Sequence, residues 1–476
     1  MGIGSMKQIT EKIAEFVSSI TYDDIPEAVT KQAESLIVDT IGCMYSGSIA
    51  DGIREIVEYL SEFDSSRDAG VFGFTNRLSI QNAALVNSAA AHARDYDDTH
   101  DEAVNHASVT TLPALIAVSQ YISKRAQEGG REHDPLNGKA FVAAFCAALE
   151  IANRIALAFI PYLGTGWLPT TLSGPFGSAC GVAKLLGLPA VTIQKAVGFA
   201  YTQIHGNRQA LIEGTLAKRI QPAFSTVAGI HAAFLAKAGL SSPVKVFTGD
   251  YGIANLYTDG KIDSKRLTDN LGTVWETGNI SIKPYPSCRC THPVIDAALE
   301  LKKTYQVDYR DIISGHIFLP PASMGQIGQP FCLGLNPTVD AQFSAQYTSA
   351  LCFVKGKPET ADFAAKTVVE RTEIHSLAGR FTVTEFDSAN RGLTPIKMQI
   401  IMKNGKTHEI SIETITGSRD KPFSELMLID KFRENLTAAG LSDDRINRII
   451  LLLKTIRDTE DIGAIFGLIQ REYREI

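Results

Sequence analysis

The 476-residue sequence has no long hydrophobic run and no excess of positive charge. Its longest apolar runs, such as 449–453, fall far short of the roughly 20 residues that cross a membrane. The formal net charge is −6, so nothing attracts the chain as a whole to nucleic acid. The phosphate-cradling patterns G-x-x-x-x-G-K-[ST] and, between a strand and a helix, G-x-G-x-x-G are also missing. We therefore expect no membrane and no nucleic-acid or nucleotide partner.

Cysteine is sparse as well. The seven cysteines are odd in number and mostly embedded in apolar helical patterns, which is typical of reduced thiols. The first residues lack the apolar stretch of a secretory signal, so we expect a cytoplasmic protein. Cys288, Cys290 and His292 lie close together, but their spacing is not that of a zinc site and a fourth ligand is missing. We therefore expect no metal at this position.

The hydrophobic pattern divides the chain into helical and mixed parts. Helical periodicity dominates from about residue 9 to residue 240, and one of the expected helices covers 79–98. Asn404-Gly405 predicts a hairpin between two β-rich runs, and helical periodicity returns from Ser424. Strand patterns occur after about residue 280, at 312–319, 381–386, 396–402 and 407–412.

These patterns predict a mainly α protein with two domains. A large all-helical domain would begin with residues 1–278, and a smaller α+β lid domain would cover 279–417. Residues 418–476 would form C-terminal helices that rejoin the helical domain, which makes the lid domain an insertion.

The densest group of titratable side chains lies in residues 92–108, at the end of an alanine-rich helix that should be buried. Asp95 and Thr99 are four residues apart, so they share a face if the helix continues that far. His106 falls at the start of the next apolar helix. Buried polar groups need partners, which favours a functional site here. A simpler alternative, that the residues end one helix and cap the next, applies to three aspartates: Asp97, Asp98 and Asp101.

Two further groups carry positive charge. Lys218 and Arg219 precede an apolar helix, where cations oppose the helix dipole by a few tenths to about 1 kcal/mol unless an anion lies between them. Lys283 and Arg289 lie at the junction of the predicted domains, a favoured place for ligand sites, on a backbone stiffened by prolines. Both groups suggest a carboxylate site. A solvated basic turn and a stiff hinge are the respective alternatives.

Together these segments resemble the motifs of the MmgE/PrpD family. The matching segments are Asp95-Tyr-Asp-Asp-Thr99, His106-Ala-Ser108, Lys218-Arg219, Lys283-Pro-Tyr-Pro286 before Thr291-His292, and residues 340–347. The similarity runs over essentially the whole chain, and the motifs are specific in combination. It implies a large helical domain with an inserted lid domain, a homodimer, and a reaction that needs no metal or organic cofactor.

The family includes 2-methylcitrate dehydratases, cis-aconitate decarboxylases and iminodisuccinate epimerases, all of which activate the carbon beside a carboxylate. The resemblance therefore implies a small di- or tricarboxylate substrate. One position departs from the family: where several members have a histidine after a Gly-Trp or comparable turn, this chain has Leu168, which cannot transfer a proton. The resemblance places the active site at Asp95, Thr99, His106, Lys218 and Lys283.

Proton removal beside a carboxylate builds negative charge, so such a site needs fixed cations and a matched acid or base. His106 is the predicted general acid or base, because imidazole can act in either direction near neutral pH. Asp95 would orient it or serve as its partner, and Lys218 and Lys283 would stabilise the charge. The predicted substrate contacts are Thr99, Arg219, Arg289 and Tyr347.

The predicted function is a cofactor-independent lyase of the dehydratase or decarboxylase type. Its substrate would be a small carboxylate such as 2-methylcitrate or cis-aconitate. Two alternatives stay open. One is an epimerase of a small dicarboxylate such as iminodisuccinate, which would exchange a proton for deuterium in unchanged substrate. The other is a non-catalytic carboxylate-binding protein, which would bind without turnover.

Overall fold

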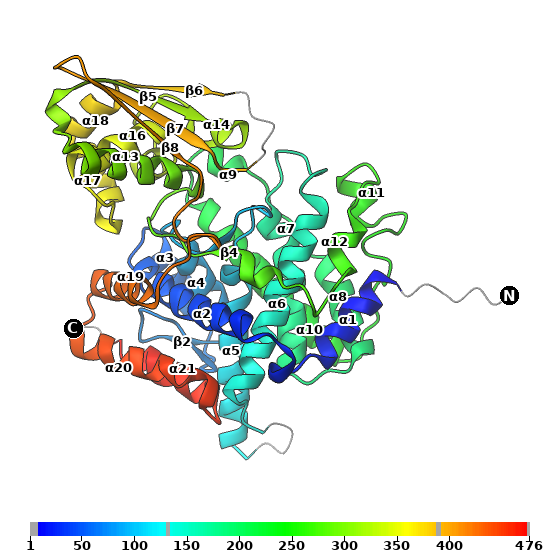
Figure 1. Ribbon diagram of the computed structural model, residues 1–476. Helices are drawn as coiled ribbons and strands as arrows, with labels where there is room; N and C mark the ends of the chain where they lie inside the picture. Colours follow the sequence, from blue (N-terminus) through cyan, green and yellow to red (C-terminus); the bar gives the residue numbers. More distant parts are fainter. Residues whose placement is uncertain (1–7, 130–133, 387–391, 474–476) are drawn as a thin grey trace.

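The computed structural model describes residues 8–129, 134–386 and 392–473. It is mainly α, with a large helical domain and a smaller α+β domain against one edge of it (Figure 1). The predicted fold class is therefore confirmed. The helices in the first part of the large domain are α1 (Ile9–Ser19), α2 (Glu27–Ser48), α3 (Ile53–Phe63), α4 (Ile80–His92), α5 (Ala107–Gln127), α6 (Gly138–Phe159), α7 (Pro169–Leu185), α8 (Ala190–Tyr201), α9 (Gln209–Ile212), α10 (Ala217–Lys237), α11 (Ile253–Tyr257) and α12 (Ser264–Thr268).

Small residues let these helices pack closely. A Cβ atom on Gly47 would lie 1.8 Å from the carbonyl oxygen of Ala90, so α2 can cross α4 at this distance only at a glycine. A Cβ atom on Gly229 would likewise lie 2.1 Å from the side chain of Ser178, where α10 crosses α7. Helix α10 packs against α4, α5 and α7, and α5 packs against α4 and α7.

Helix α6 is long and apolar enough, by length and composition, to cross a membrane. Almost all of its apolar stretch is buried inside the protein, where it packs against α7, α5 and α12. A core helix of a large domain passes the same test of length and composition. We therefore interpret α6 as the central core helix of the large domain.

The small domain is built on a four-stranded sheet in the order β6-β5-β7-β8. Strands β5 and β6 are parallel, and the other neighbouring pairs are antiparallel. The hairpin predicted at Asn404-Gly405 is confirmed, with Gly405 at φ 78° in the turn. The strands are β5 (Ile312–Leu319), β6 (Phe381–Glu385), β7 (Ile396–Met402) and β8 (Thr407–Ile412). The helices are α13 (His292–Tyr305), α14 (Pro321–Ile327), α15 (Pro337–Gln342), α16 (Ala345–Val354), α17 (Ala365–Glu370) and α18 (Thr372–Ala378).

The C-terminal helices return to the large domain: α19 packs against α2, and α21 packs against α5 (Figure 1). One hydrophobic core combines residues 13–282 with residues 428–469, and a second core combines residues 285–412. We keep the predicted division into 1–278, 279–417 and 418–476 as a proposal for the folding units. The three C-terminal helices are α19 (Glu425–Ala438), α20 (Asp443–Lys454) and α21 (Ile462–Arg471).

Candidate active site

The segment between α4 and α5 carries most of the predicted site residues. The helix expected over 79–98 ends at His92, and Asp95 adopts a left-handed backbone with φ 52°. Such a conformation costs a non-glycine residue about 1–3 kcal/mol and is common at functional sites. The condition under which Asp95 and Thr99 would share a helix face, a helix that continues to Thr99, is therefore not met. Thr99 instead lies in the short strand β3 (Thr99–His100), which pairs with β4 (Ile280–Ser281) just before Lys283.

Asp95 binds two lysines that come from different segments of the chain. Its Oδ1 atom lies 3.2 Å from Lys218 Nζ, at the start of α10, and 3.2 Å from Lys283 Nζ. Lys283 also donates to the Asp95 carbonyl oxygen at 2.9 Å, and only 1% of its surface is exposed. Burial alone would raise the pKa of the Asp95 carboxyl, but the two ammonium groups outweigh burial and lower it. The structure thus brings together three residues that the sequence had placed in one site.

Asp97 binds two histidines. Its Oδ2 atom lies 2.9 Å from His92 Nδ1 and 2.8 Å from His106 Nδ1, and His106 Nδ1 also lies 2.9 Å from the carbonyl oxygen of Asp98. Burial would raise the pKa of Asp97, but the two imidazoles hold it well below its usual range. A carboxylate and a carbonyl only accept hydrogen bonds, so both Nδ1 atoms carry protons, and in the neutral form of either ring Nε2 is the nitrogen with the lone pair. His106, the residue before α5, is therefore prepared to take a proton at Nε2.

Asp98 follows Asp97 in the chain, and its side chain is fully buried. Burial raises the pKa of its carboxyl to about 8, and the negative charges of Asp97 and Asp39 add to the effect. The hydroxyl group of Ser108 lowers the pKa of this carboxyl, but burial outweighs it. Asp97 does not merely cap a helix, because its carboxylate binds His92 and His106. The Asp98 carboxylate makes no hydrogen bond to the N–H groups at the start of α5 in the described part of the chain.

A stability measurement can test the protonation of Asp98. Above its unperturbed pKa of about 3.9, the unfolded chain loses this proton while the folded protein keeps it. The free energy of unfolding should therefore fall as the pH rises from about 4 to about 8. We expect Asp98→Asn to make this fall shallower, measured by urea unfolding at pH 5, 6, 7 and 8. Exposed Asp430→Asn is the matched control, and equal slopes in all three proteins would contradict the prediction.

Lys431 holds the backbone of the segment between α4 and α5 in place. This buried lysine of α19 forms an ion pair with Asp39 at 2.6 Å and donates to the Tyr96 carbonyl oxygen at 2.8 Å. Its ammonium group also lies 4.0 Å from the centre of the Tyr96 ring. Tyr96 separates Asp95 from Asp97, so Lys431 fixes the backbone between the two halves of the cluster. Sequence reasoning missed this residue, which lies more than 300 positions away in the chain.

The small domain closes one side of the cluster. Gln342, at the end of α15, donates through Nε2 to the carbonyl oxygens of Arg94 at 2.8 Å and Pro286 at 2.9 Å. The next residue, Phe343, places its ring 5.4 Å from Lys218 Nζ. Both lie in the segment 340–347 that the sequence analysis had singled out. The predicted contact from that segment, Tyr347, is instead completely buried in the core of the small domain, beside Phe331.

Arg289 and Arg219, two predicted substrate contacts, form hydrogen bonds to other residues of the protein. Arg289 binds Asp101 through two hydrogen bonds, Nε to Oδ1 at 2.9 Å and Nη2 to Oδ2 at 3.0 Å, and donates to the Thr416 carbonyl oxygen. Arg219 is buried and donates to the carbonyl oxygen of Asp51, in the turn between α2 and α3. Neither guanidinium group is hydrogen-bonded to the Asp95 or Asp97 carboxylates. Arg289 and Asp101 instead join the small domain to the segment that carries the cluster.

Leu168 lies next to the cluster but takes no part in its hydrogen bonds. It is the residue before α7, and Thr170, two residues later, accepts a hydrogen bond from the His106 backbone N–H at 3.0 Å. The start of α7 therefore positions His106 through its main chain.

His92, Asp97 and His106 are also the residues that could hold a metal ion. Among the described residues they form one group of potential ligand atoms, all within 4.8 Å of one another. Two strong hydrogen bonds to a carboxylate already account for their arrangement. Cys288 and Cys290 are both buried, and neither is part of this group.

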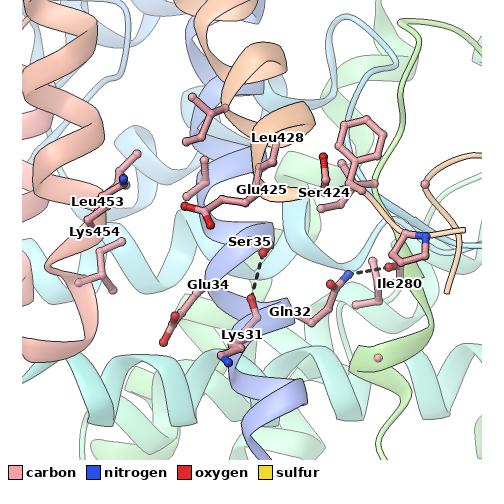
Figure 2. A pocket seen from close by; sticks show the side chains of 18 of the residues that line it. Lys31, Gln32, Glu34, Ser35, Ile280, Ser424, Glu425, Leu428, Leu453 and Lys454 are labelled. Atoms are coloured by element: carbon pink, nitrogen blue, oxygen red, sulfur yellow. Dashed lines mark hydrogen bonds between the residues drawn. The ribbon is translucent and has the colours of Figure 1, made fainter.

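A wider cavity lies elsewhere. It has a volume of about 500 Å³ and lies between α2, α19 and α20, with Lys31, Glu34, Glu425 and Lys454 among its lining residues (Figure 2). Its described lining includes none of the residues that bind Asp95 or Asp97. The buried cluster, rather than this cavity, is the candidate active site, because proton transfer requires converging titratable groups with perturbed pKa values.

A helical domain, a smaller domain closing over it and a buried acid–base cluster at their junction describe an enzyme. The chain matches the MmgE/PrpD N-terminal domain over residues 11–265 and the MmgE/PrpD C-terminal domain over residues 285–455. It therefore belongs to the MmgE/PrpD family.

Several relatives are similar over almost their whole length. The cis-aconitate decarboxylase of Aspergillus terreus is 26% identical over 478 residues, which cover 97% of this chain and 96% of the relative. The human cis-aconitate decarboxylase is 24% identical over 98% of this chain and 95% of its own length. The mouse cis-aconitate decarboxylase is 22% identical over 98% of this chain and 94% of its own length.

Proposed function

We propose that this protein is a lyase that works without a cofactor and activates the carbon beside a carboxylate in a small di- or tricarboxylate. One observation carries the proposal. Adjacent parts of a single segment hold a carboxylate with two ammonium groups, at Asp95, and a carboxylate with two imidazoles, at Asp97. The first half can stabilise negative charge and the second can move a proton, which are the two requirements of this chemistry.

In the proposed reaction, Nε2 of His106 removes the proton from the carbon beside a substrate carboxylate. The electron pair left on carbon spreads onto that carboxylate, where the ammonium groups of Lys218 and Lys283 lower the energy of the developing charge. Asp97 stays ionised and stabilises the imidazolium that forms. The electron pair then forms a double bond to the neighbouring carbon and expels a leaving group from it. When the leaving group is a hydroxyl, His106 can return its proton to it, so that it departs as water. In a decarboxylation, the electron pair would instead come from the bond to the lost CO2, and a protonated His106 would supply the proton that the product carbon takes up.

The names of the relatives support cis-aconitate-like substrates, since three of them are cis-aconitate decarboxylases. Leu168 bears on which reaction occurs, because its alkyl side chain can neither give nor take a proton. We therefore propose a reaction in which His106 carries the proton transfer. Thr99, which is buried beside the cluster, remains our proposed hydrogen-bonding contact for a substrate carboxylate.

The decisive experiment incubates the protein in D2O with 2-methylcitrate, citrate, cis-aconitate and iminodisuccinate in turn, first without and then with EDTA, and follows each by NMR. We expect loss of water or CO2 from one of them. Deuterium in otherwise unchanged substrate would favour an epimerase instead. Binding without any turnover would favour a non-catalytic protein. Activity that disappears when EDTA is added would contradict the cofactor-free proposal.

We also propose that the protein is a homodimer in the cytoplasm, as its family resemblance implies. Sedimentation equilibrium at several protein concentrations would test the dimer. A mass that stays at the 51.6 kDa of one chain would contradict it.

A further inference from the structure

Two imidazoles share one carboxylate oxygen in this protein. His92 is the last residue of α4 and His106 immediately precedes α5, and these two helices pack against each other. Both Nδ1 atoms point to Asp97 Oδ2, and the two ring centres are 5.0 Å apart with the planes at 70°. One oxygen therefore divides its negative charge between two N–H donors.

The two histidines differ in exposure. Only 5% of the His92 side chain is exposed, whereas 20% of the His106 side chain is exposed. Burial lowers the pKa of His92 to about 4, and the nearby positive charge of Lys218 acts in the same direction. His92 is therefore a neutral donor near neutral pH. His106 is the ring with better access to a substrate, so the two share Asp97 without sharing a role.

We propose that His92 is a positioning residue that sets the basicity of His106 through Asp97. The N–H of His92 takes up part of the negative charge on Oδ2, which leaves less to stabilise the imidazolium form of His106. It also fixes the Asp97 carboxylate so that Oδ2 faces His106. When His106 Nε2 accepts a proton, Asp97 stays ionised and His92 keeps its Nδ1 proton. The proposal rests on the proposed function only in assigning His106 as the base.

Other charged groups surround the two rings, and a substitution at position 92 removes none of them. Lys218, Asp95 and Lys283 belong to the other half of the cluster, and Asp98, Asp39 and Lys431 lie behind Asp97. Comparing variants at position 92 therefore isolates the donor that His92 supplies.

The test compares His92→Leu, which removes the donor, with His92→Asn, whose amide N–H can replace the imidazole Nδ1–H. Without the donor, Asp97 stabilises the His106 imidazolium more strongly. His106 then loses its Nε2 proton, and becomes able to act as a base, only at a higher pH. We expect the acid side of the kcat/KM profile of His92→Leu to move up by roughly half a pH unit or more, since hydrogen bonds to charged groups are strong. His92→Asn should keep the wild-type profile.

A direct measurement separates this proposal from the proposed function. Protein labelled with 13C-histidine is titrated by NMR without substrate, and the His106 signal is assigned from its loss in His106→Ala. The midpoint of the His106 titration should rise in His92→Leu and stay at the wild-type value in His92→Asn. In an Asp97→Asn background, His92→Leu should no longer change it. If the midpoint changes as expected but the protein transforms no carboxylate, the proposed lyase function is contradicted. The proposed positioning role of His92 is still supported in that case.

Equal midpoints in wild type and His92→Leu would overturn the proposal. His92→Phe, which keeps a ring of similar shape but has no donor, replaces the leucine variant if that protein does not fold. His92→Asn gives an independent result. If its His106 titration midpoint is as high as that of the donor-free variant, the proposed role of His92 is also contradicted.

Discussion

His106→Ala should lower turnover at least about 100-fold, the usual contribution of a positioned general acid or base. The reason is geometric. The Nδ1 proton of His106 is held by Asp97 Oδ2 at 2.8 Å and by the Asp98 carbonyl oxygen at 2.9 Å, which leaves Nε2 for the substrate. Alanine removes the proton acceptor but keeps the main-chain hydrogen bond to Thr170. Initial rates by NMR, with the substrate that the wild type transforms, would measure the loss.

A matched control separates lost chemistry from lost structure. His375 in the small domain is also partly buried and also hydrogen-bonds a backbone carbonyl, that of Val368 at 2.7 Å, but it lies in the core beside Tyr347. We expect His375→Ala to keep wild-type turnover. His106→Ala should show an unchanged circular dichroism spectrum. Wild-type turnover in His106→Ala would exclude it as the acid or base.

The second large effect is expected at Lys283. Lys283→Met keeps the alkyl chain but removes the buried ammonium group that faces Asp95, and turnover should fall at least about 100-fold, the scale seen when one charge-stabilising donor is lost. Because breaking a buried ion pair costs about 3–5 kcal/mol, some loss of stability should accompany it. Lys218 still neutralises Asp95 and limits that loss. Rates and urea unfolding should be measured on the same preparation.

Lys302→Met is the control for this variant. The Lys302 ammonium group also donates to backbone carbonyls, those of Cys352 at 3.3 Å and Val354 at 3.4 Å, but it lies in the small domain away from the cluster. It should keep wild-type turnover. Near-normal turnover in a folded Lys283→Met protein would show that the ammonium group does not stabilise the reacting charge.

The fold was predictable because it follows from periodicity that a single sequence displays. Helical repeats, the strands after residue 280 and the Asn404-Gly405 hairpin all depend on neighbours within a few residues. The end of α4 was not predictable in this way. Its alanine-rich pattern continues past His92, and the helix stops where Asp95 takes a left-handed conformation to meet two lysines that are distant in sequence.

The site residues also differ in how far the sequence alone could predict them. Asp95, His106, Lys218 and Lys283 were found because charges in apolar surroundings need a reason, and the structure brings them together. Arg219 and Arg289 met the same criterion, but a backbone carbonyl and Asp101 satisfy them instead. The choice of partner depends on tertiary packing, which one sequence does not show. His92 could have been assigned, because it lies in the same dense cluster as Asp97.

Lys431 gives the C-terminal segment a part in the site, although we assign no reacting group to it. Without this residue, the buried Asp39 carboxylate would lose its ion-pair partner directly beneath the segment that holds Asp95 and Asp97. During synthesis, residues 92–106 leave the ribosome long before residue 431. A chain that ended before α19 would therefore contain every proposed reacting group but would lack the contacts from Lys431 to Asp39 and Tyr96.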